Sequence, residues 1–236
     1  MQLGNVWQVP RPRVLLPEPL RVAGAALLAA CVAALLAAFA AGRGDPGPLD
    51  TALDPRIQAW LGRFPALLHW LPRLGGLKEV GLMIAALSLA CVATRRWSGA
   101  VLVLVAVPAA VALTEYVLKP YVGTIINQAF PSGHATSSFA LAAVFVILIA
   151  DPLYRRVPGA LRLALVLLAL LVAGSVAAAM IATGAHTVTD AIAGAAVGTG
   201  VVLSCALTLV LATRRAGVFG CGMVVIGEPP PEGSNR

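Results

Sequence analysis

The sequence predicts an all-α fold, a bundle of six membrane-spanning helices. Hydrophobic residues make up 59% of the 236 residues and charged residues only 11%, and the mean hydropathy is +0.90. A soluble domain of this size cannot bury so much apolar surface. The charged residues also cluster between long uncharged runs, as in integral membrane proteins. The composition therefore excludes a soluble enzyme or a soluble DNA-binding protein.

Six apolar stretches approach or reach the roughly 20 residues that a helix needs to cross about 30 Å of hydrocarbon. They are 22–41, 77–94, 98–118, 134–150, 161–181 and 190–213. The first stretch has a second interpretation as a signal peptide, because it ends in small residues before Gly42. Its apolar run is longer than the usual signal-peptide core and its leader is long, so we favour a spanning helix.

Arginines occupy every second connection between these stretches: Arg11, Arg13, Arg21, Arg95, Arg96, Arg155, Arg156, Arg162, Arg214 and Arg215. The positive-inside rule then places both termini and these connections in the cytoplasm. The connections 42–76, 119–133 and 182–189 face outward. The arginine and alanine bias is typical of a GC-rich genome and favours a bacterial plasma membrane.

The chain divides into a cytoplasmic segment (1–21), a membrane domain (22–213) and a tail (214–236) for which we expect disorder. Within the first outer connection, 51–73 alternates apolar residues and arginines at helical spacing. This pattern predicts an amphipathic helix in the membrane interface. A helix that merely packs over the bundle and a helix that gates substrate access both remain open.

Charge and cysteine usage exclude further classes of protein. The net charge of +7 comes from short basic clusters beside apolar runs, so we expect no nucleic acid partner. The four cysteines have neither metal-ligand spacing nor an extracellular pairing pattern, and we expect no metal, no other cofactor and no disulfide framework. The Gly194-x-x-x-Gly198 spacing leaves open tight helix packing or a dimer contact, and hence a homo-oligomer.

Three polar segments lie at the outer ends of spans, where ionisable groups are costly unless they have a function. The first ends the third span with Glu115 and Lys119, four apart in the order that favours an ion pair. Alternatively, Lys119 only extends to the lipid headgroups. The second, 130–138, reads F-P-S-G-H-A-T-S-S.

In this second segment, Ser132 is a natural helix N-cap and Gly133 allows a ligand close to the backbone. The helix end would then present free N–H groups to an anion such as phosphate. His134 beside it is a candidate proton donor for a leaving oxygen. A simple helix start explains the same residues without a ligand.

The third segment, 184–190, contains His186 and Asp190. If it is helical, these side chains share a face, and the carboxylate accepts from one imidazole nitrogen while the other stays free as a nucleophile or base. An aspartate that only caps the helix is the alternative. The three segments in combination favour a catalytic site.

Together, Lys119, the run P-S-G-H over 131–134, and His186 with Asp190 resemble the type 2 phosphatidic acid phosphatase and vanadium haloperoxidase superfamily, over roughly residues 77–213. That family's motifs are K-x6-R-P, P-S-G-H and S-R-x5-H-x3-D. The second is complete here and the others are partial. The resemblance implies a six-span membrane phosphatase of the lipid-phosphatase branch.

The resemblance also implies a role for each matching residue. His186 would attack phosphorus to form a phosphohistidine, Asp190 would orient it, and His134 would protonate the leaving alcohol. The phosphoryl oxygens would be held by Lys119, Ser132 and the Gly133 amide. No metal is implied.

Both phosphate-binding arginines of the family are absent from their positions, which hold Ile126-Asn127 and Ala179-Met180. Losing one preorganised donor costs roughly 3–4 kcal/mol in other enzymes. The missing positive charge would be restored by Arg63 or Arg73, or by a cation that the substrate itself carries.

We therefore expect hydrolysis of a lipid-linked phosphate or polyprenyl diphosphate at the outer face, with membrane lipids as the surroundings. The alternative is a catalytically weak relative that binds a lipid phosphate or acts as a membrane scaffold. A small transporter has little support, because charges within the spans are scarce.

Overall fold

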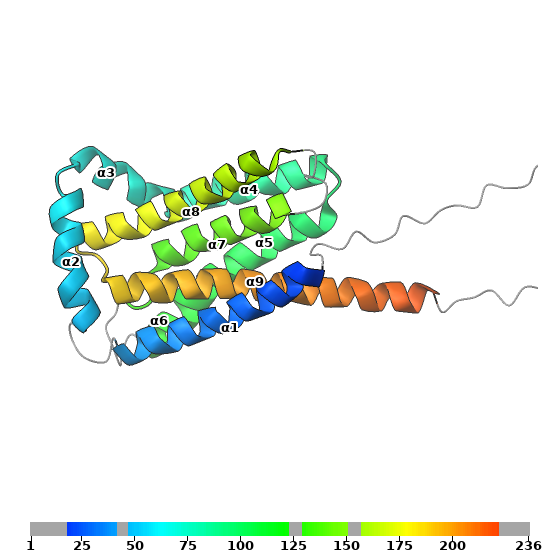
Figure 1. Cartoon of the computed structure of the whole chain (residues 1–236), viewed down its shortest axis with the longest axis horizontal. Coiled ribbons are helices and arrows are strands. Elements are labelled where there is room, and N and C mark those ends of the chain that lie inside the picture. Colours follow the sequence, from blue (N-terminus) through cyan, green and yellow to red (C-terminus); the bar gives the residue numbers. More distant parts are fainter. Residues whose placement is uncertain (1–17, 42–46, 123–128, 151–156, 222–236) are drawn as a thin grey trace, which may run out of the picture.

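The computed structural model describes residues 18–41, 47–122, 129–150 and 157–221. All regular elements in these residues are helices (Figure 1), which confirms the predicted all-α class. In chain order they are α1 (Glu18–Ala41), α2 (Pro48–Leu61), α3 (Pro65–Leu74), α4 (Leu77–Ala93), α5 (Trp97–Ala112), the π-helical turn η1 (Leu113–Leu118), α6 (Lys119–Val122), α7 (Gly133–Ala150), α8 (Gly159–Ala182) and α9 (Val188–Cys221).

Five helices in the described part of the chain are long and apolar enough to cross a membrane: Leu20–Ala41, Trp97–Val122, Gly133–Ala150, Gly159–Ala182 and Val188–Ala212. A sixth candidate is α4, which has 17 residues and passes only together with α3, from which it is bent by 55°. The chain is therefore a multi-pass membrane protein. The number of spans is six if this bent pair crosses the membrane once.

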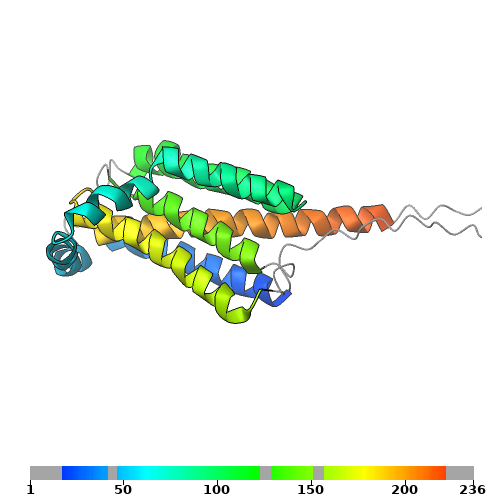
Figure 2. The ribbon, with the colours of Figure 1, turned by 90° about the horizontal axis from the view of Figure 1, so that it is seen from above.

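The helices lie in three layers, as Figure 2 shows from above. Helices α4 and α5 form one outer layer, α7 and α9 the middle, and α1 and α8 the other side. Helix α9 packs against α1, α5 and α7, so it is central to the bundle. The main core joins α4, α5, α7 and α9, with Val103, Val144 and Val202 fully buried.

Two glycines bring α9 very close to α7. A Cβ on Gly194 would strike the Ser132 carbonyl oxygen, and one on Gly198 would strike the Thr136 carbonyl oxygen. Backbone atoms cannot move aside as a flexible side chain can. The Gly194-x-x-x-Gly198 spacing therefore serves helix packing inside the chain.

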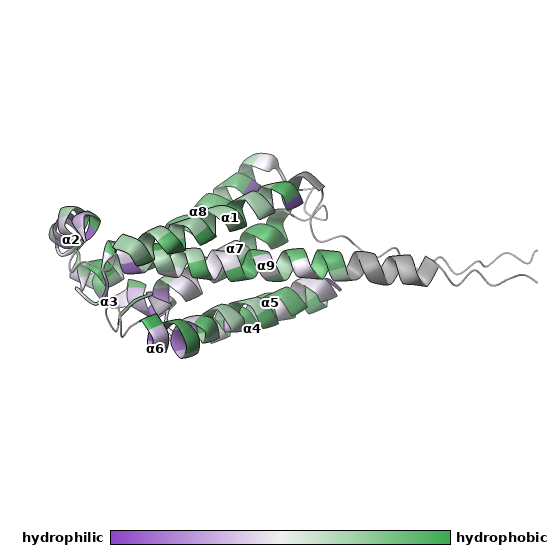
Figure 3. Cartoon of the chain, turned by 90° about the horizontal axis from the view of Figure 1, so that it is seen from below, coloured by the Kyte–Doolittle hydropathy of each residue, from purple (hydrophilic) through white to green (hydrophobic). Residues whose placement is uncertain are grey.

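The two ends of the bundle differ in character. Figure 3 shows apolar colours along the long helices and hydrophilic residues gathered at the end formed by α2, α3 and α6. The opposite end carries the turn between α4 and α5. There Arg96 is buried and donates through Nη2 to the Leu148 carbonyl at 2.8 Å, where the end of α7 leaves carbonyl groups that favour a cation.

The outer segment 51–73 forms two helices, so the prediction of one amphipathic helix is wrong. The chain turns at Gly62–Phe64, and Pro65 starts α3, because proline suits the first helical turn, where its missing N–H costs no hydrogen bond. Leu53 and Ile57 of α2 pack against α7, α8 and α9. The apolar face of α2 thus lies on the bundle.

Helix α9 differs from its predicted bounds at both ends. It begins at Val188 and continues to Cys221, so part of the predicted disordered tail is helical. The arginine pair after 213 does not end the helix, because arginine is a good helix former. Residues 222–236 lie outside the described residues.

Candidate active site

The three polar segments come together at the end of the bundle that carries α2. His134 is the second residue of α7, Lys119 begins α6, and His186 lies in the connection between α8 and α9. The Ser132 N–H, just before α7, donates to the Asp190 carbonyl at 3.0 Å, and a Cβ added to Gly133 would lie 3.4 Å from Lys119 Nζ. Residues 15 and 52 positions apart in the sequence thus form one cluster.

His186 and Asp190 lie close together, and His186 lies just before α9 rather than within it. The two atoms nearest each other are His186 Nδ1 and Asp190 Oδ2, 3.5 Å apart, and the side chains are only 9% and 2% exposed. Nδ1 has no hydrogen-bond partner among the described residues. A small rotation of the imidazole would complete the bond to Asp190.

A reciprocal cap explains why α9 starts after His186. The Thr187 N–H donates to Asp190 Oδ2 at 3.1 Å, and the Asp190 N–H donates to Thr187 Oγ1 at 3.2 Å. This pair has the form of a capping box, with Thr187 as N-cap. Asp190 therefore both caps α9 and faces His186. The helix cap and the contact with His186, which the sequence offers as alternatives, are both present.

The end of α8 fixes the backbone on the other side of His186. Gly184 has φ of +73°, the left-handed conformation that glycine adopts without strain. Its N–H donates to Ile181 O at 2.9 Å, and that of Ala185 donates to Met180 O at 3.1 Å, which is a Schellman motif. The His186 N–H also donates to Met180 O at 3.2 Å, so the histidine backbone is tied to α8.

Ser132 caps α7, as the sequence predicts. Its Oγ accepts from the Ala135 N–H at 3.4 Å, and the serine is fully buried. The Ser132 N–H donates to the Asp190 carbonyl at 3.0 Å. This bond joins the starts of α7 and α9 and fixes the position of His134 relative to His186.

Lys119 is held by Glu115, as the spacing predicts. Its Nζ donates to both carboxylate oxygens of Glu115, at 2.7 and 2.9 Å. Glu115 lies in the π-helical turn η1, a rare geometry that often marks functional sites. The turn is tied to α7 because Thr114 Oγ1 donates to Thr136 Oγ1 at 3.1 Å.

Comparison with known proteins identifies the family. A sequence model of the PAP2 superfamily matches residues 22–214. The chain belongs to the PAP2 superfamily. Members are generally phosphatases, so at the level of the family the chain is a membrane phosphatase-like protein. No curated protein and no solved structure matches it significantly.

No arginine replaces the two that this PAP2 chain lacks, within the described part of the site. Arg73 is exposed and its guanidinium lies over the Trp70 ring, 4.7 Å from the centroid. Arg63 is exposed at the turn after α2. Neither forms a hydrogen bond or ion pair with His134 or His186 among the described residues. Positions 126 and 127 lie outside the described residues.

Sequence reasoning missed two aspartates of α2 that bind the start of α9. Asp50 Oδ1 accepts from the Thr189 N–H at 2.8 Å and from its hydroxyl at 2.6 Å. Asp54 Oδ1 accepts from the Val188 N–H at 3.0 Å. These bonds occupy N–H groups that the first turn of a helix leaves unpaired. The signal was present, since both aspartates recur at helical spacing with Leu53 and Ile57.

The environment of Asp54 disfavours its charged form. Burial raises the pKa of its carboxyl above the ordinary value, the Val188 N–H opposes this, and the negative charges of Asp50 and Asp190 raise the pKa further. A cluster of three carboxylates at one helix start thus carries an electrostatic cost. The N–H groups of α9 offset part of that cost.

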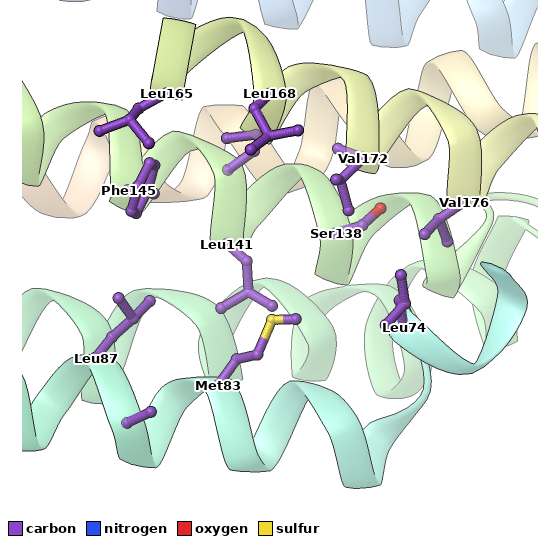
Figure 4. Close-up of a pocket in the computed structure, with 14 residues that line it drawn as sticks. Leu74, Met83, Leu87, Ser138, Leu141, Phe145, Leu165, Leu168, Val172 and Val176 are labelled. Carbon is purple, nitrogen blue, oxygen red and sulfur yellow. The ribbon is translucent and has the colours of Figure 1, made fainter. Parts of the chain in front are cut away.

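An apolar groove begins close to His134 and runs along the bundle (Figure 4). It has a volume of about 350 Å³ and lies between α4 and α8, with α7 as its floor. Ser138 lines one end, and its Oγ donates to the His134 carbonyl at 2.8 Å. Leu87 and Phe145 line the other end. The groove therefore ends one helical turn of α7 from His134, which does not line it.

Proposed function

We propose that the protein hydrolyses a lipid-linked phosphate or diphosphate through a phosphohistidine on His186. One observation carries this proposal: His134, Lys119 and the His186–Asp190 pair lie at one end of the bundle, one helical turn of α7 from an apolar groove. A nucleophile with an orienting carboxylate, a proton donor and a cation are the groups that phosphoryl transfer needs. The substrate is then a phosphate attached to a hydrocarbon chain.

In the first step, Asp190 keeps the imidazole proton on Nδ1, so the lone pair on Nε2 of His186 attacks phosphorus. A nitrogen–phosphorus bond forms as the bond from phosphorus to the leaving oxygen breaks. His134 gives its proton to that oxygen, which leaves as the alcohol or, from a diphosphate, as the lipid monophosphate.

In the second step, His134 takes a proton from water, and the resulting hydroxide attacks the phosphohistidine. The nitrogen–phosphorus bond breaks and inorganic phosphate leaves. Lys119, Ser132 and the Gly133 amide would stabilise the charge on the phosphoryl oxygens in both steps. Support for this role comes from the position of Gly133, whose N–H is in the first turn of α7 and lacks a partner within the helix.

The groove supports a lipid substrate. Its lining is apolar apart from Ser138, and it lies along spans that face hydrocarbon in a bilayer. A chain in the groove would bring its phosphate to the level of His134, one helical turn from Ser138. We propose a bacterial plasma membrane with the site outward and both termini cytoplasmic. Arg95 and Arg96, at the opposite end of the bundle, support this orientation.

A second candidate function is binding of a lipid phosphate without hydrolysis. The observation in its favour is that Lys119 is paired with Glu115 and no arginine contacts the histidines in the described part of the chain. The bound phosphate would then lack the charge stabilisation on which turnover depends.

Phosphate release by the purified protein in detergent tests the proposal. The substrates are phosphatidate, phosphatidylglycerol phosphate and polyprenyl diphosphate, with His186→Ala as the control. We expect release from at least one lipid and none from the variant. Equal phosphate release from the folded wild type and the folded variant on every lipid would contradict hydrolysis through His186. No release, with lipid phosphate still bound, would favour the binding function.

A larger side chain in the groove tests whether the groove holds the hydrocarbon chain of the substrate. Ala86 lines the groove, whereas its neighbour Ala85 does not, and both are exposed on α4. Ala86→Phe should raise KM several-fold for a long-chain substrate and leave a short-chain phosphate unaffected, while Ala85→Phe should change neither. The same increase of KM in both variants would argue against a chain in the groove.

A further inference from the structure

The carboxylate of Glu115 lies where the substrate phosphate is expected. It accepts both hydrogen bonds from Lys119 Nζ and lies against the backbone of Gly133, so that a Cβ added to Gly133 would strike Glu115 Oε1. That added Cβ would also lie 3.4 Å from Lys119 Nζ. Glu115 thus contacts two of the groups assigned to the phosphate.

The shape of the chain around Glu115 maintains this contact. The π-helical turn η1 keeps Glu115 and Lys119 on one face and is tied to α7 through the Thr114–Thr136 hydrogen bond. Gly133, with no side chain, leaves the space that the carboxylate fills. The two side chains of the ion pair keep partial exposure, 25% and 36%, so the pair is not locked inside the core.

We propose that Glu115 is a specificity-determining residue, an internal anion that competes with the substrate phosphate for Lys119 and for the start of α7. This inference rests on the proposed function. A phosphoryl group enters by displacing the carboxylate from Lys119, or by binding beside it against charge repulsion. The site therefore selects against the dianion of a phosphomonoester and favours its monoanion.

The missing arginines increase the effect of Glu115. Two guanidinium groups would outweigh one carboxylate, but no arginine contacts the histidines within the described residues. Lys119 is then the main cation for the phosphate, and Glu115 neutralises it. Removing the negative charge of Glu115 frees Lys119 for an incoming anion without changing the size of the side chain.

The test is phosphate binding by the His186→Ala protein, with and without Glu115→Gln, measured by titration calorimetry with inorganic phosphate at pH 8, where phosphate is mainly a dianion. We expect Glu115→Gln to tighten binding by roughly tenfold, the order that follows from removing one like charge near a partly exposed site. Because this background cannot form a phosphohistidine, the outcome does not depend on whether the protein hydrolyses lipids.

Two further variants test whether the gain in phosphate affinity depends on the pair of Glu115 and Lys119. Glu79→Gln removes the same charge at the same end of the bundle from a carboxylate that, among the described residues, does not pair with Lys119, and it should leave the affinity unchanged. Adding Lys119→Gln to Glu115→Gln should abolish the gain, because the gain requires a free ammonium group. Unchanged, weaker or undetectable phosphate binding in the folded Glu115→Gln protein, or an equal gain in Glu79→Gln, would overturn the proposal.

Discussion

At the scale of single residues, Asp190 combines two roles within a few ångströms. Its Oδ2 accepts from the Thr187 N–H at 3.1 Å and lies 3.5 Å from His186 Nδ1. The first contact starts α9, and the second orients the proposed nucleophile. A structural and a catalytic requirement therefore fall on the same carboxylate.

An Asp190→Asn substitution should separate these roles. The amide oxygen still accepts from Thr187, so the free energy of unfolding should fall by less than about 1 kcal/mol. The neutral amide does not balance the positive charge that the His186 ring gains when Nε2 bonds to phosphorus, and kcat should fall about 100-fold or more. Thermal unfolding and phosphate release on the same preparation measure both effects. A variant with full activity would show that Asp190 is a cap only.

At the scale of helices, the contact between α7 and α9 determines the geometry of the site. His134 is on α7 and His186 precedes α9, and the two helices meet where Gly194 and Gly198 admit the carbonyl groups of Ser132 and Thr136. Small residues permit such close backbone approach. The histidines are therefore positioned by Gly194 and Gly198, which follow His186 by 8 and 12 residues.

Gly198→Ala should force the two helices apart. The added Cβ would strike the Thr136 carbonyl, and we expect a loss of about 1–3 kcal/mol in stability, together with lower activity. Gly174→Ala on α8 is the matched control, because a Cβ there has no neighbour within 4 Å and should be neutral or slightly stabilising. Melting temperatures in detergent would compare them. Equal melting temperatures of the two variants would contradict the packing described for α7 and α9.

Helix α2 makes its own contribution by binding the start of α9 with two aspartates. Burial is the largest cause that raises the Asp54 pKa, so the folded protein holds this proton more tightly than the unfolded chain. The stabilisation linked to that proton is fully present below the ordinary carboxyl pKa and is lost as the pH rises through the raised value.

Asp54→Asn removes this titration while its amide oxygen can still accept from Val188. The melting temperature of the variant minus that of the wild type should therefore increase as the pH rises from about 4 to 7. Thermal unfolding of both proteins across this range provides the measurement. A difference that stays constant or shrinks with rising pH would show that the folded environment does not raise this pKa.

At the scale of the whole molecule, the sequence predicted the features that depend on composition and short spacing. The apolar runs gave the spans, the four-residue spacing of Glu115 and Lys119 gave their ion pair, and Ser132 before Gly133 gave the cap of α7. Each depends on residues near one another in the chain, so local rules suffice.

Features that depend on distant segments could not be predicted in this way. The aspartates of α2 meet the start of α9 across more than a hundred residues, and the groove needs three helices from separate parts of the chain. The Thr187 cap starts α9 after His186, so the contact of His186 with Asp190 does not need a shared helix face. The Gly133–Glu115 contact likewise appears only when η1 packs against α7.

The measurement that tests the central claim most directly is the capture of a phosphoryl group on the protein. The purified protein is incubated with phosphatidate labelled in its phosphate, quenched in alkali, and the labelled peptide is identified. We expect a label on His186 that is stable to alkali and labile to acid, and neither label nor phosphate release in His186→Ala. Phosphate release that continues in His186→Ala, or a label on another residue, would contradict it.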